Sequence, residues 1–452
     1  MDIIKFKQLN PNYIIPRYTH FDKKIKLRDA FGYVTKKCNI EKHKFFPFIF
    51  YQKETIKYNK ASGVKIKKRD LCYAAHKDSL IYKYYATILN EKYNQFLYEH
   101  ALDNCPVAYR SNLRGKSNIN FAKNAFNFIK KQQSAYVIIG DFKDFFPSLE
   151  HKYLKNRICT LLGVDTLEDD YYAVFKNITK YSYVKLEELL KYNKLPNNKE
   201  GNKKFNNLEI AIPIGSLDNL KKNGLLHIIK NKDKGIPQGS PISGILANIY
   251  MSSFDLRIKE LVDSCFGFYM RYSDDIIIII PANSDFSEKY HKILNEIQAI
   301  PNLLLEDEKK NIFYYVDGKL KNITNKYLKN KKQSHNILNY LGFSFDGKDI
   351  WIREKTTCKY YYRMRRKAKT IRKNNFVTKR LNTIDKKKLY ELYSERHEKK
   401  NIKGINKNKY GNFIDYVRRA ENIFPNERRI ANLRKRHMSK IAAQLKCKKV
   451  LF

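Results

Sequence analysis

Short runs of β-branched and aromatic residues along the chain predict buried strands. Three segments show this pattern: residues 136–140, 266–280 and 340–345. The first ends in a glycine and predicts a strand with Asp141 at its exit. The second predicts a hairpin of two strands, with Asp274 and Asp275 in the turn between them. The third predicts one further strand.

Apolar residues at helical spacing predict helices between these strands and after them. The spacing indicates a helix that begins near Asp78 and further helices at about 120–131 and 242–250. After about Trp351 the chain becomes very basic and mostly helical in pattern. Two helices predicted there carry the apolar stripes Tyr361, Met364, Ala368 and Ile371, and Ile430, Leu433, Met438, Ile441 and Leu445.

Changes in composition divide the chain into three predicted parts. Residues 1–60 are basic and aromatic without a clear period, and we interpret them as an N-terminal extension that packs on the second part. That part, residues 61–350, contains the predicted strands, with an exposed insertion or loop at about 190–210 that is rich in Asn, Lys and Gly. Residues 351–452 form the basic, helical C-terminal part. The length exceeds that of one compact core, so we expect two or three packed subdomains.

The charge of the chain narrows the choice of partner. Its 452 residues include 90 Lys and Arg against 45 Asp and Glu, which gives a formal net charge of +45 at pH 7. Such an excess indicates a polyanionic partner, either nucleic acid or an acidic membrane surface. Hydrophobic residues at 43% and aromatic residues at 14% are enough to build buried cores, which argues against a disordered chain.

Several features indicate a reduced, cytoplasmic protein without a membrane partner. The longest strongly apolar run, residues 276–280, is far shorter than the roughly 20 residues that a membrane-spanning helix needs. The first residues have no apolar core of signal-peptide length. The 7 cysteines are scattered singly, so neither a zinc site nor a disulfide framework is indicated.

Asp141, Asp274 and Asp275 are conspicuous because each lies beside an apolar strand. Carboxylates gathered at strand ends are costly unless a cation neutralises them. Mg²⁺ suits this role, since it prefers oxygen ligands and keeps positions open for phosphate. Two such ions about 4 Å apart can hold both the attacking hydroxyl and the leaving oxygen of a phosphoryl transfer. Taken alone, an Asp-Asp pair is equally typical of an ordinary surface turn.

Four ordered motifs give these acids a context. They are residues 141–149, the Pro-Gln-Gly segment 235–243, Tyr-Ser-Asp-Asp at 272–275 and Leu-Gly-Phe at 341–343. In this order they resemble the reverse transcriptase family, in the prokaryotic branch with group II intron, retron and phage-defence enzymes. The resemblance covers roughly residues 60–350. It implies an α+β right-hand polymerase with fingers and palm, an antiparallel palm sheet, and a helical, basic C-terminal thumb that holds the template–primer.

The resemblance also implies roles for the acids and for one further strand motif. Asp141 and Asp274 match the metal ligands of the palm. Asp275 matches the third acid beside them; the alternative is that it only shapes the turn. The implied cofactors are two Mg²⁺ ions. The motif that grips the primer corresponds to Leu341, Gly342 and Phe343.

Four other residues match positions that contact the incoming nucleotide. Arg69 corresponds to the fingers arginine that grips the triphosphate, and Gln238 lies among glycines that permit close backbone approach. Phe146 corresponds to the bulky residue under the sugar, which leaves no space for a 2′-hydroxyl and so favours deoxynucleotides. Lys309 corresponds to a lysine near the phosphates that can act as a general acid. The ordinary alternatives are a basic surface stretch for Arg69, a core aromatic for Phe146, and a solvated charge run for Lys309, with Lys310 as its rival.

The branch of the family sets the expected function. Residues 69–86 resemble the unknown-group or defence-associated enzymes, and the Val-Thr-Gly signature of retron enzymes is missing. This implies an RNA-directed DNA polymerase that makes cDNA from dNTPs on a cognate non-coding RNA, with a primer–template, in antiphage defence. Two alternatives stay open: a template-independent or protein-primed DNA polymerase of the abortive-infection type, and a catalytically silent RNA-binding scaffold. The sequence does not indicate an oligomeric state.

Overall fold

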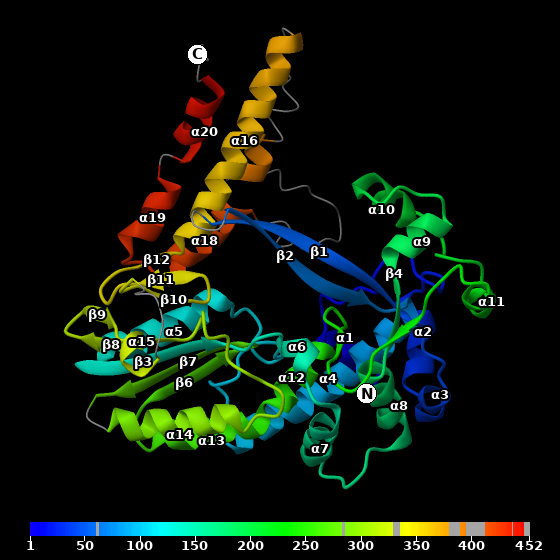
Figure 1. Ribbon diagram of the computed structural model, residues 1–452, viewed down its shortest axis with the longest axis horizontal. Helices are drawn as coiled ribbons and strands as arrows, with labels where there is room; N and C mark the ends of the chain where they lie inside the picture. Colours follow the sequence, from blue (N-terminus) through cyan, green and yellow to red (C-terminus); the bar gives the residue numbers. More distant parts are fainter. Residues whose placement is uncertain are drawn as a thin grey trace.

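Three sheets and the helices around them make up the molecule (Figure 1). The computed structural model describes residues 1–59, 63–282, 285–328, 335–378, 389–394, 412–435 and 437–446. In these ranges no helix is both long enough and apolar enough to cross a membrane.

The central sheet is antiparallel and has five strands. Their order is β6 (Phe268–Tyr272), β7 (Asp275–Pro281), β3 (Ser134–Asp141), β8 (Asn311–Val316) and β9 (Lys319–Asn322). The strand predicted at 136–140 and the hairpin predicted at 266–280 are confirmed as β3 and β6–β7. Every residue of Ile276–Ile280 is completely buried, because both faces of the sheet are covered. This explains why the run is continuously apolar instead of alternating.

Helices cover one face of this sheet, and helices together with a second sheet cover the other (Figure 1). The first face packs against α4 (His76–Glu99), α12 (Ser243–Tyr250), α13 (Ser252–Asp263) and α14 (Phe286–Gln298). The second face packs against α5 (Asn118–Lys131), whose N-terminus has a capping box at Ser117. The helices predicted near Asp78, at 120–131 and at 242–250 are confirmed as α4, α5 and α12.

The second sheet corrects the prediction of a single strand at 340–345. It has three short strands, β10 (Leu338–Tyr340), β11 (Phe343–Phe345) and β12 (Ile350–Ile352). Leu341 and Gly342 form the two-residue turn between β10 and β11, with φ of 46° and 89°. Positive φ at both central residues is the signature of a type I′ turn, which matches the twist of a hairpin. The motif is therefore a tight turn and not the middle of a strand.

A long antiparallel hairpin projects from the third sheet and lies above the central sheet in Figure 1. Its strands are β1 (Phe48–Asn59) and β2 (Gly63–Tyr73), joined in the sheet by β4 (Ser182–Lys185) and β5 (Ile229–Lys230). The boundary predicted after residue 60 falls at the tip of this hairpin, whose strands pair along their whole length. The fold is not divided there.

Smaller helices complete the body of the molecule. The N-terminal helices α1 (Ile3–Leu9) and α2 (Leu27–Val34) pack on α4, and α3 (Lys37–Glu41) packs on α8. The others are α6 (Phe145–Ser148), α7 (His151–Leu162), α8 (Asp169–Thr179), α9 (Leu186–Tyr192), α10 (Lys199–Phe205), α11 (Leu217–Lys222) and α15 (Thr324–Tyr327). Of the exposed insertion or loop predicted at about 190–210, the loop is corrected, because the segment includes the end of α9 and all of α10. Phe205 is buried there in a small core with Leu189 and Leu190.

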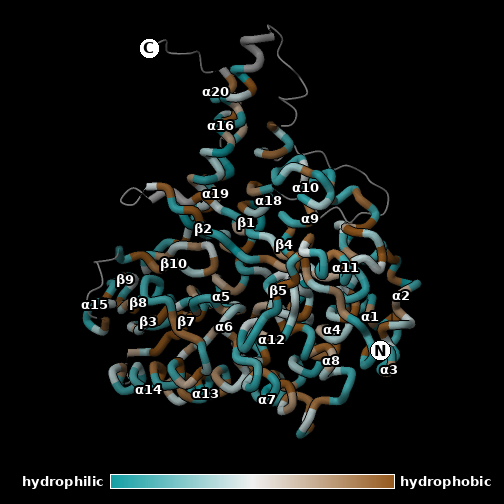
Figure 2. The backbone as a smooth tube through the Cα atoms, turned by 45° about the vertical axis from the view of Figure 1, so that its right-hand side comes forward, coloured by the Kyte–Doolittle hydropathy of each residue, from teal (hydrophilic) through white to brown (hydrophobic). Residues whose placement is uncertain are grey.

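The described C-terminal part contains the helices α16 (Glu354–Thr378), α18 (Phe413–Ile423), α19 (Arg428–Arg434) and α20 (His437–Lys446). Of these, α16 and α20 project from the body in both views (Figures 1 and 2). The stripe of Met364, Ala368 and Ile371 is buried against α20, as the spacing predicted. The second predicted helix is instead two helices: Ile430 on α19 packs against the second sheet, and Ile441 on α20 packs on α16. Residues 379–388, 395–411, 436 and 447–452 of this part lie outside the described ranges.

Candidate active site

Two strand ends bring the predicted acids together. Strand β3 ends at Asp141 and β7 begins at Asp275, and these residues are direct partners in the antiparallel ladder. Asp274 lies in the turn before β7, and its carbonyl accepts a hydrogen bond from the Phe142 amide at 3.1 Å. The sheet register therefore makes neighbours of carboxylates that are more than 130 residues apart in the sequence.

The surroundings of Asp274 and Asp275 raise the pKa of both carboxyl groups. Burial, together with the charges of Asp274 and Asp141 and a hydrogen bond with Asp141, raises the pKa of Asp275 to about 7. Burial and the charge of Asp141 also raise the pKa of Asp274. Close carboxylates resist simultaneous ionisation in a poorly solvated site. A bound cation would relieve that repulsion.

Lys309 supplies a positive charge at this place. Its Nζ lies 2.6 Å from Oδ1 of Asp141 and also forms an ion pair with Glu306. Burial alone would lower the pKa of Lys309, but the bonds to Asp141 and Glu306 raise it above its ordinary value. The loop is fixed beside β3, because the Glu306 amide donates to the Asp141 carbonyl at 2.8 Å. Its rival Lys310 is buried, which lowers its pKa.

The carboxylates of this site are suitable ligands for a hard divalent cation, although their side chains are not arranged as a complete metal site. In the described part of the chain, no three His, Cys, Asp or Glu side chains are grouped closely enough to hold a metal. Asp141 and Asp275 still offer adjacent carboxylate oxygens, which are the ligands that Mg²⁺ prefers. Lys309 occupies one oxygen of Asp141. The residues present therefore fit Mg²⁺ in chemistry.

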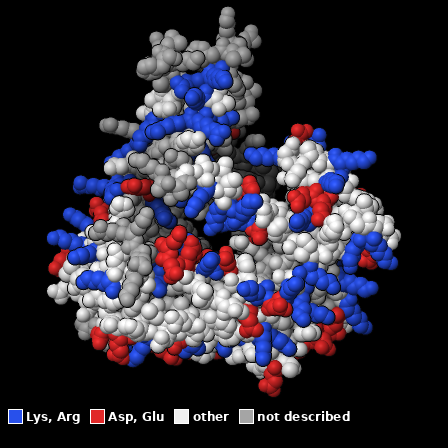
Figure 3. Space-filling model, viewed as in Figure 1, with Lys and Arg blue, Asp and Glu red and all other residues white. Residues whose placement is uncertain are grey.

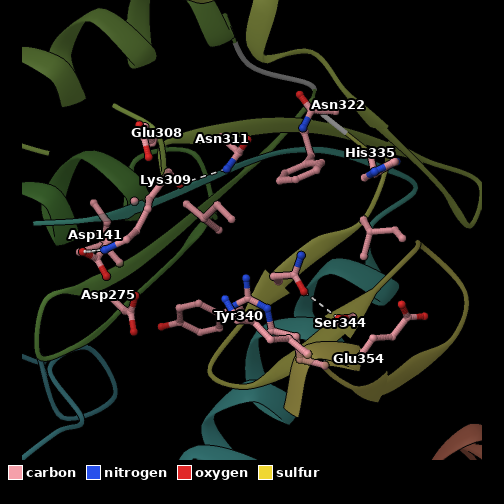
Figure 4. A pocket seen from close by; sticks show the side chains of 18 of the residues that line it. Asp141, Asp275, Glu308, Lys309, Asn311, Asn322, His335, Tyr340, Ser344 and Glu354 are labelled. Atoms are coloured by element: carbon pink, nitrogen blue, oxygen red, sulfur yellow. Dashed lines mark hydrogen bonds and ion pairs between the residues drawn. The ribbon is translucent and has the colours of Figure 1, made fainter. Parts of the chain in front are cut away.

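A cavity of about 740 Å³ opens beside the acids, between the central sheet and the second sheet. Figure 4 shows Asp141, Asp275 and Lys309 at one end, and His335 and Glu354 at the other. The hydroxyl of Tyr340 points toward Asp275, and burial together with the charge of Asp275 raises the Tyr340 pKa. That hydroxyl has no hydrogen-bond partner among the described residues. The cavity thus combines acids, a cation and polar groups in one space.

Phe146 and Gln238 meet at a second cavity, of about 510 Å³. Phe146 is half-buried on α6, and its carbonyl accepts a hydrogen bond from the Ile236 amide at 3.0 Å. Gly235 has φ of +84°, and a Cβ there would lie 2.6 Å from the Pro147 carbonyl oxygen. Only glycine permits this contact, so the Pro-Gln-Gly loop is seated directly on the segment after Asp141.

Arg69 lies on the β1–β2 hairpin, in a different sheet from the carboxylates. It is exposed on β2 and faces Lys53 of β1 across the ladder. The end of β2 touches the Pro-Gln-Gly loop, because the Cys72 amide donates to the Gln238 carbonyl at 2.9 Å. The hairpin is therefore fixed at its base, beside the second cavity.

The Leu341–Gly342 turn connects three parts of the molecule. The Leu341 carbonyl accepts a hydrogen bond from Nδ2 of Asn118, at the start of α5, at 2.8 Å. The same amide nitrogen lies 3.1 Å from the hydroxyl of Tyr416 on α18. Phe343 is completely buried and packs on the Tyr416 ring. The turn is thus anchored to α5, which packs on the central sheet, and to the C-terminal helix α18.

A family model covers this arrangement. The model for "Reverse transcriptase (RNA-dependent DNA polymerase)" matches residues 80–345, which is more than half of the chain. The protein belongs to the reverse transcriptase family. Both cavities, the acids and the central sheet lie within or against the matched residues. The β1–β2 hairpin and the C-terminal helices lie outside them.

Solved structures of telomerase show a distant likeness. Apo telomerase from Candida tropicalis is 14% identical with a TM-score of 0.42, over 69% of this chain and 49% of that one. A form truncated from the C-terminal domain is 15% identical with a TM-score of 0.40, over 67% and 57%. Candida albicans telomerase with a TWJ fragment of telomeric RNA is 14% identical with a TM-score of 0.35, over 72% and 49%. This reverse transcriptase spans about half the length of those chains. No curated protein matches it.

Two residues of this reverse transcriptase site were missed by the sequence analysis. Arg271 is completely buried behind the turn that carries the acids, and a charged residue inside an apolar strand was a usable signal. The hydroxyl of Tyr109 lies 3.2 Å from Oγ of Ser273 in the same turn. A Cβ on Gly244 would lie 2.7 Å from the Tyr109 ring, so glycine makes room for it. No local pattern reveals the contact of Tyr109 with Ser273, because the residues are 164 positions apart.

Proposed function

We propose that this protein is an RNA-directed DNA polymerase that uses two Mg²⁺ ions and a cognate RNA template. The observation that carries the proposal is the pairing of Asp141 with Asp275 at one end of an open cavity, with Lys309 bonded to Asp141. Membership of the reverse transcriptase family supports the same reaction.

The acids would hold the metal ions in this reaction. Asp141 and Asp275, with Asp274 beside them, supply the carboxylate oxygens. When bound, Mg²⁺ supplies positive charge that stabilises the attacking 3′-oxygen of the primer and the phosphate of the nucleotide. The raised pKa of Asp275 reflects burial together with crowded negative charge, and a cation at this place would offset both.

Lys309 and Phe146 would act on the incoming dNTP. The Nζ of Lys309 is protonated at neutral pH, and its bonds to Asp141 and Glu306 raise its pKa further, so it carries a proton that the leaving pyrophosphate would accept. Phe146 lines the second cavity beside Gln238, and its ring would exclude a 2′-hydroxyl. Arg69 suits the triphosphate through its planar guanidinium. Leu341, Gly342 and Phe343 would hold the primer end.

Basic surfaces support a nucleic-acid partner. One face of α16 exposes Lys355, Lys359, Tyr362, Arg366 and Lys369. At 1.5 Å per residue this stripe is about 20 Å long, enough to follow a phosphate backbone. We propose that these helices form the thumb that holds the template–primer.

The β1–β2 hairpin separates its charges by face. Alternation along the paired strands places Lys53, Lys65, Lys67 and Arg69 on one face. The acids lie on the other face, where Glu54 pairs with Lys68 at 3.6 Å and Asp70 accepts from Gln52 at 2.9 Å. Figure 3 shows Lys and Arg side chains of the hairpin above a hollow in the molecule. These cations form no ion pair with any described residue, so they are available to a phosphate backbone.

Neighbouring lysines on the hairpin give a matched test of this surface. Lys67 and Lys68 are both exposed but lie on opposite faces. We expect Lys67→Ala to lower the slope of log affinity against log salt by about one for a template–primer. Lys68→Ala removes the same charge from a residue already paired with Glu54, and should leave that slope unchanged. Titrations over a range of salt measure both, and equal slopes for the two variants would contradict the assignment.

The biological role rests on the branch of the family. The resemblance of residues 69–86 to defence-associated enzymes supports antiphage defence, with cDNA made in the cytoplasm on a cognate non-coding RNA.

Sequencing of co-purified nucleic acid tests the function. The full chain, purified with its bound RNA and supplied with dNTPs, should yield DNA complementary to that RNA. Homopolymeric or random DNA would favour template-independent synthesis, and DNA that stays attached to protein after denaturation would favour protein priming. RNA binding without DNA synthesis at any Mg²⁺ concentration would overturn the polymerase proposal in favour of a scaffold.

A further inference from the structure

A buried ion pair joins the strand before the acidic turn to a neighbouring helix, and both of its members make further hydrogen bonds. Arg271 on β6 and Asp255 on α13 are both completely buried. Nε of Arg271 donates to Oδ1 of Asp255 at 2.8 Å, and Nη2 donates to Oδ2 at 2.6 Å. The Tyr269 hydroxyl also donates to Oδ1 of Asp255, at 2.6 Å. This two-pronged geometry holds the guanidinium plane in one orientation.

The remaining arm of the guanidinium reaches the turn itself. Nη1 of Arg271 donates to the Ser273 carbonyl at 3.0 Å and to Oδ1 of Asn248 on α12 at 3.2 Å. The Ser273 carbonyl belongs to the peptide that joins Ser273 to Asp274. Arg271 therefore links the peptide immediately before the acids to two helices, to α13 through Asp255 and to α12 through Asn248.

The turn needs such support because its backbone is strained. Ser273 has φ of +62°, in the left-handed region that costs a non-glycine residue roughly 1 kcal/mol or more. On the other side of the turn, the Phe142 amide donates to the Asp274 carbonyl. The turn is thus held from the helix side by Arg271 and from the β3 side by Phe142.

A buried ion pair of this kind is not expected to add much to the stability of the folded protein. Replacing a buried ion pair by apolar side chains of similar size is often neutral or stabilising, because both charges lose their hydration on burial. An apolar pair would fill the same space but could not bond the Ser273 carbonyl. What the charged pair provides, and an apolar pair would not, is a hydrogen bond that fixes the position of the turn.

We infer that Arg271, oriented by Asp255 and Asn248, is a positioning residue that fixes the turn and so aligns Asp275 with Asp141. The inference rests on the proposed polymerase function. Arg271 is shielded from the cavity and does not touch the reacting groups. Its effect passes through the Ser273 carbonyl.

Two variants distinguish a role of Arg271 in positioning the turn from a role in packing the core. Arg271→Lys keeps a charge for Asp255 but lacks the fork that bonds Asp255 and Ser273 together. Arg271→Met combined with Asp255→Leu keeps an apolar filling without any bond to the turn. The first readout is hydrogen–deuterium exchange of a peptide that contains residues 271–276, which needs neither metal nor activity. The second is kcat and KM for primer extension, measured beside wild-type protein.

The expected result is a mobile turn in a folded protein. Both variants should unfold cooperatively near the wild-type temperature, exchange faster at residues 271–276 but not in β3, and lose about 100-fold in kcat with KM for the primer–template unchanged. Wild-type exchange at the turn, or wild-type kcat, in either folded variant would overturn the inference. Failure of both variants to fold would also overturn it, since Arg271 would then serve the core alone. An inactive wild-type protein would instead refute the polymerase proposal, and the exchange data would still decide the role of Arg271.

Discussion

Asp275→Asn and Asp141→Asn are each expected to lower kcat for DNA synthesis by about a thousandfold or more. Either change removes a carboxylate that would hold Mg²⁺, while the amide keeps the size of the side chain. Because the pKa of Asp275 is already raised by burial and by its acidic neighbours, its neutral replacement should not weaken the fold. Primer extension with saturating dNTPs measures the loss, and thermal unfolding measures the stability.

Asp144→Asn is the matched control for these variants. Asp144 lies three residues after Asp141 but is exposed, with φ of 44°. Asparagine tolerates this left-handed conformation, so the change removes one nearby charge without strain. Its kcat should stay within about twofold of wild type, as for most exposed substitutions. A variant of Asp141 or Asp275 that keeps a tenth of the wild-type activity would contradict the metal-binding role.

Strong local patterns were enough to predict the centre of the fold. The β-branched run that ends at Gly140 and the apolar run from Ile276 to Ile280 each specify a strand. The acids between them fall at strand ends for that reason. Helices with long apolar stripes were equally visible, because one buried face imposes its period on the sequence.

Features that depend on tertiary contacts could not be predicted in this way. The strands around Leu341 and Gly342 have three residues each, too few for a period, so the turn was hidden within them. The long β1–β2 hairpin was missed because both of its faces are exposed over most of its described length, so no buried side imposes an apolar pattern. The bond of Lys309 to Asp141 joins residues that are 168 positions apart.

The partner of a buried charge is also invisible in a sequence. Arg271 stands out in an apolar strand, but Asp255 looks like any acidic residue on a helix. Which acid it meets depends on how α13 crosses the sheet. The same limit applies to Tyr109, whose place beside Ser273 requires a glycine on α12.

Phe146→Val is expected to weaken discrimination against ribonucleotides by about 100-fold. Phe146 is half-buried, rests on the rings of Phe145 and Tyr109, and faces the second cavity beside Gln238. If its ring excludes the 2′-hydroxyl, a smaller side chain opens that space and raises kcat/KM for rNTPs far more than for dNTPs. The measurement is the ratio of kcat/KM for dGTP and GTP on one primer–template.

Phe145→Val separates this effect from a loss of core packing. Phe145 is the neighbouring aromatic on α6, but it is buried and packs on Phe142. Its truncation should cost roughly 1–3 kcal/mol of stability through the cavity it leaves, and should leave the dGTP to GTP ratio unchanged. If Phe146→Val lowers stability in the same way and also keeps the wild-type ratio, Phe146 is an ordinary core aromatic. Sugar selection would then have to come from another residue of the second cavity, and Tyr109 is the nearest aromatic candidate because its ring contacts Phe146.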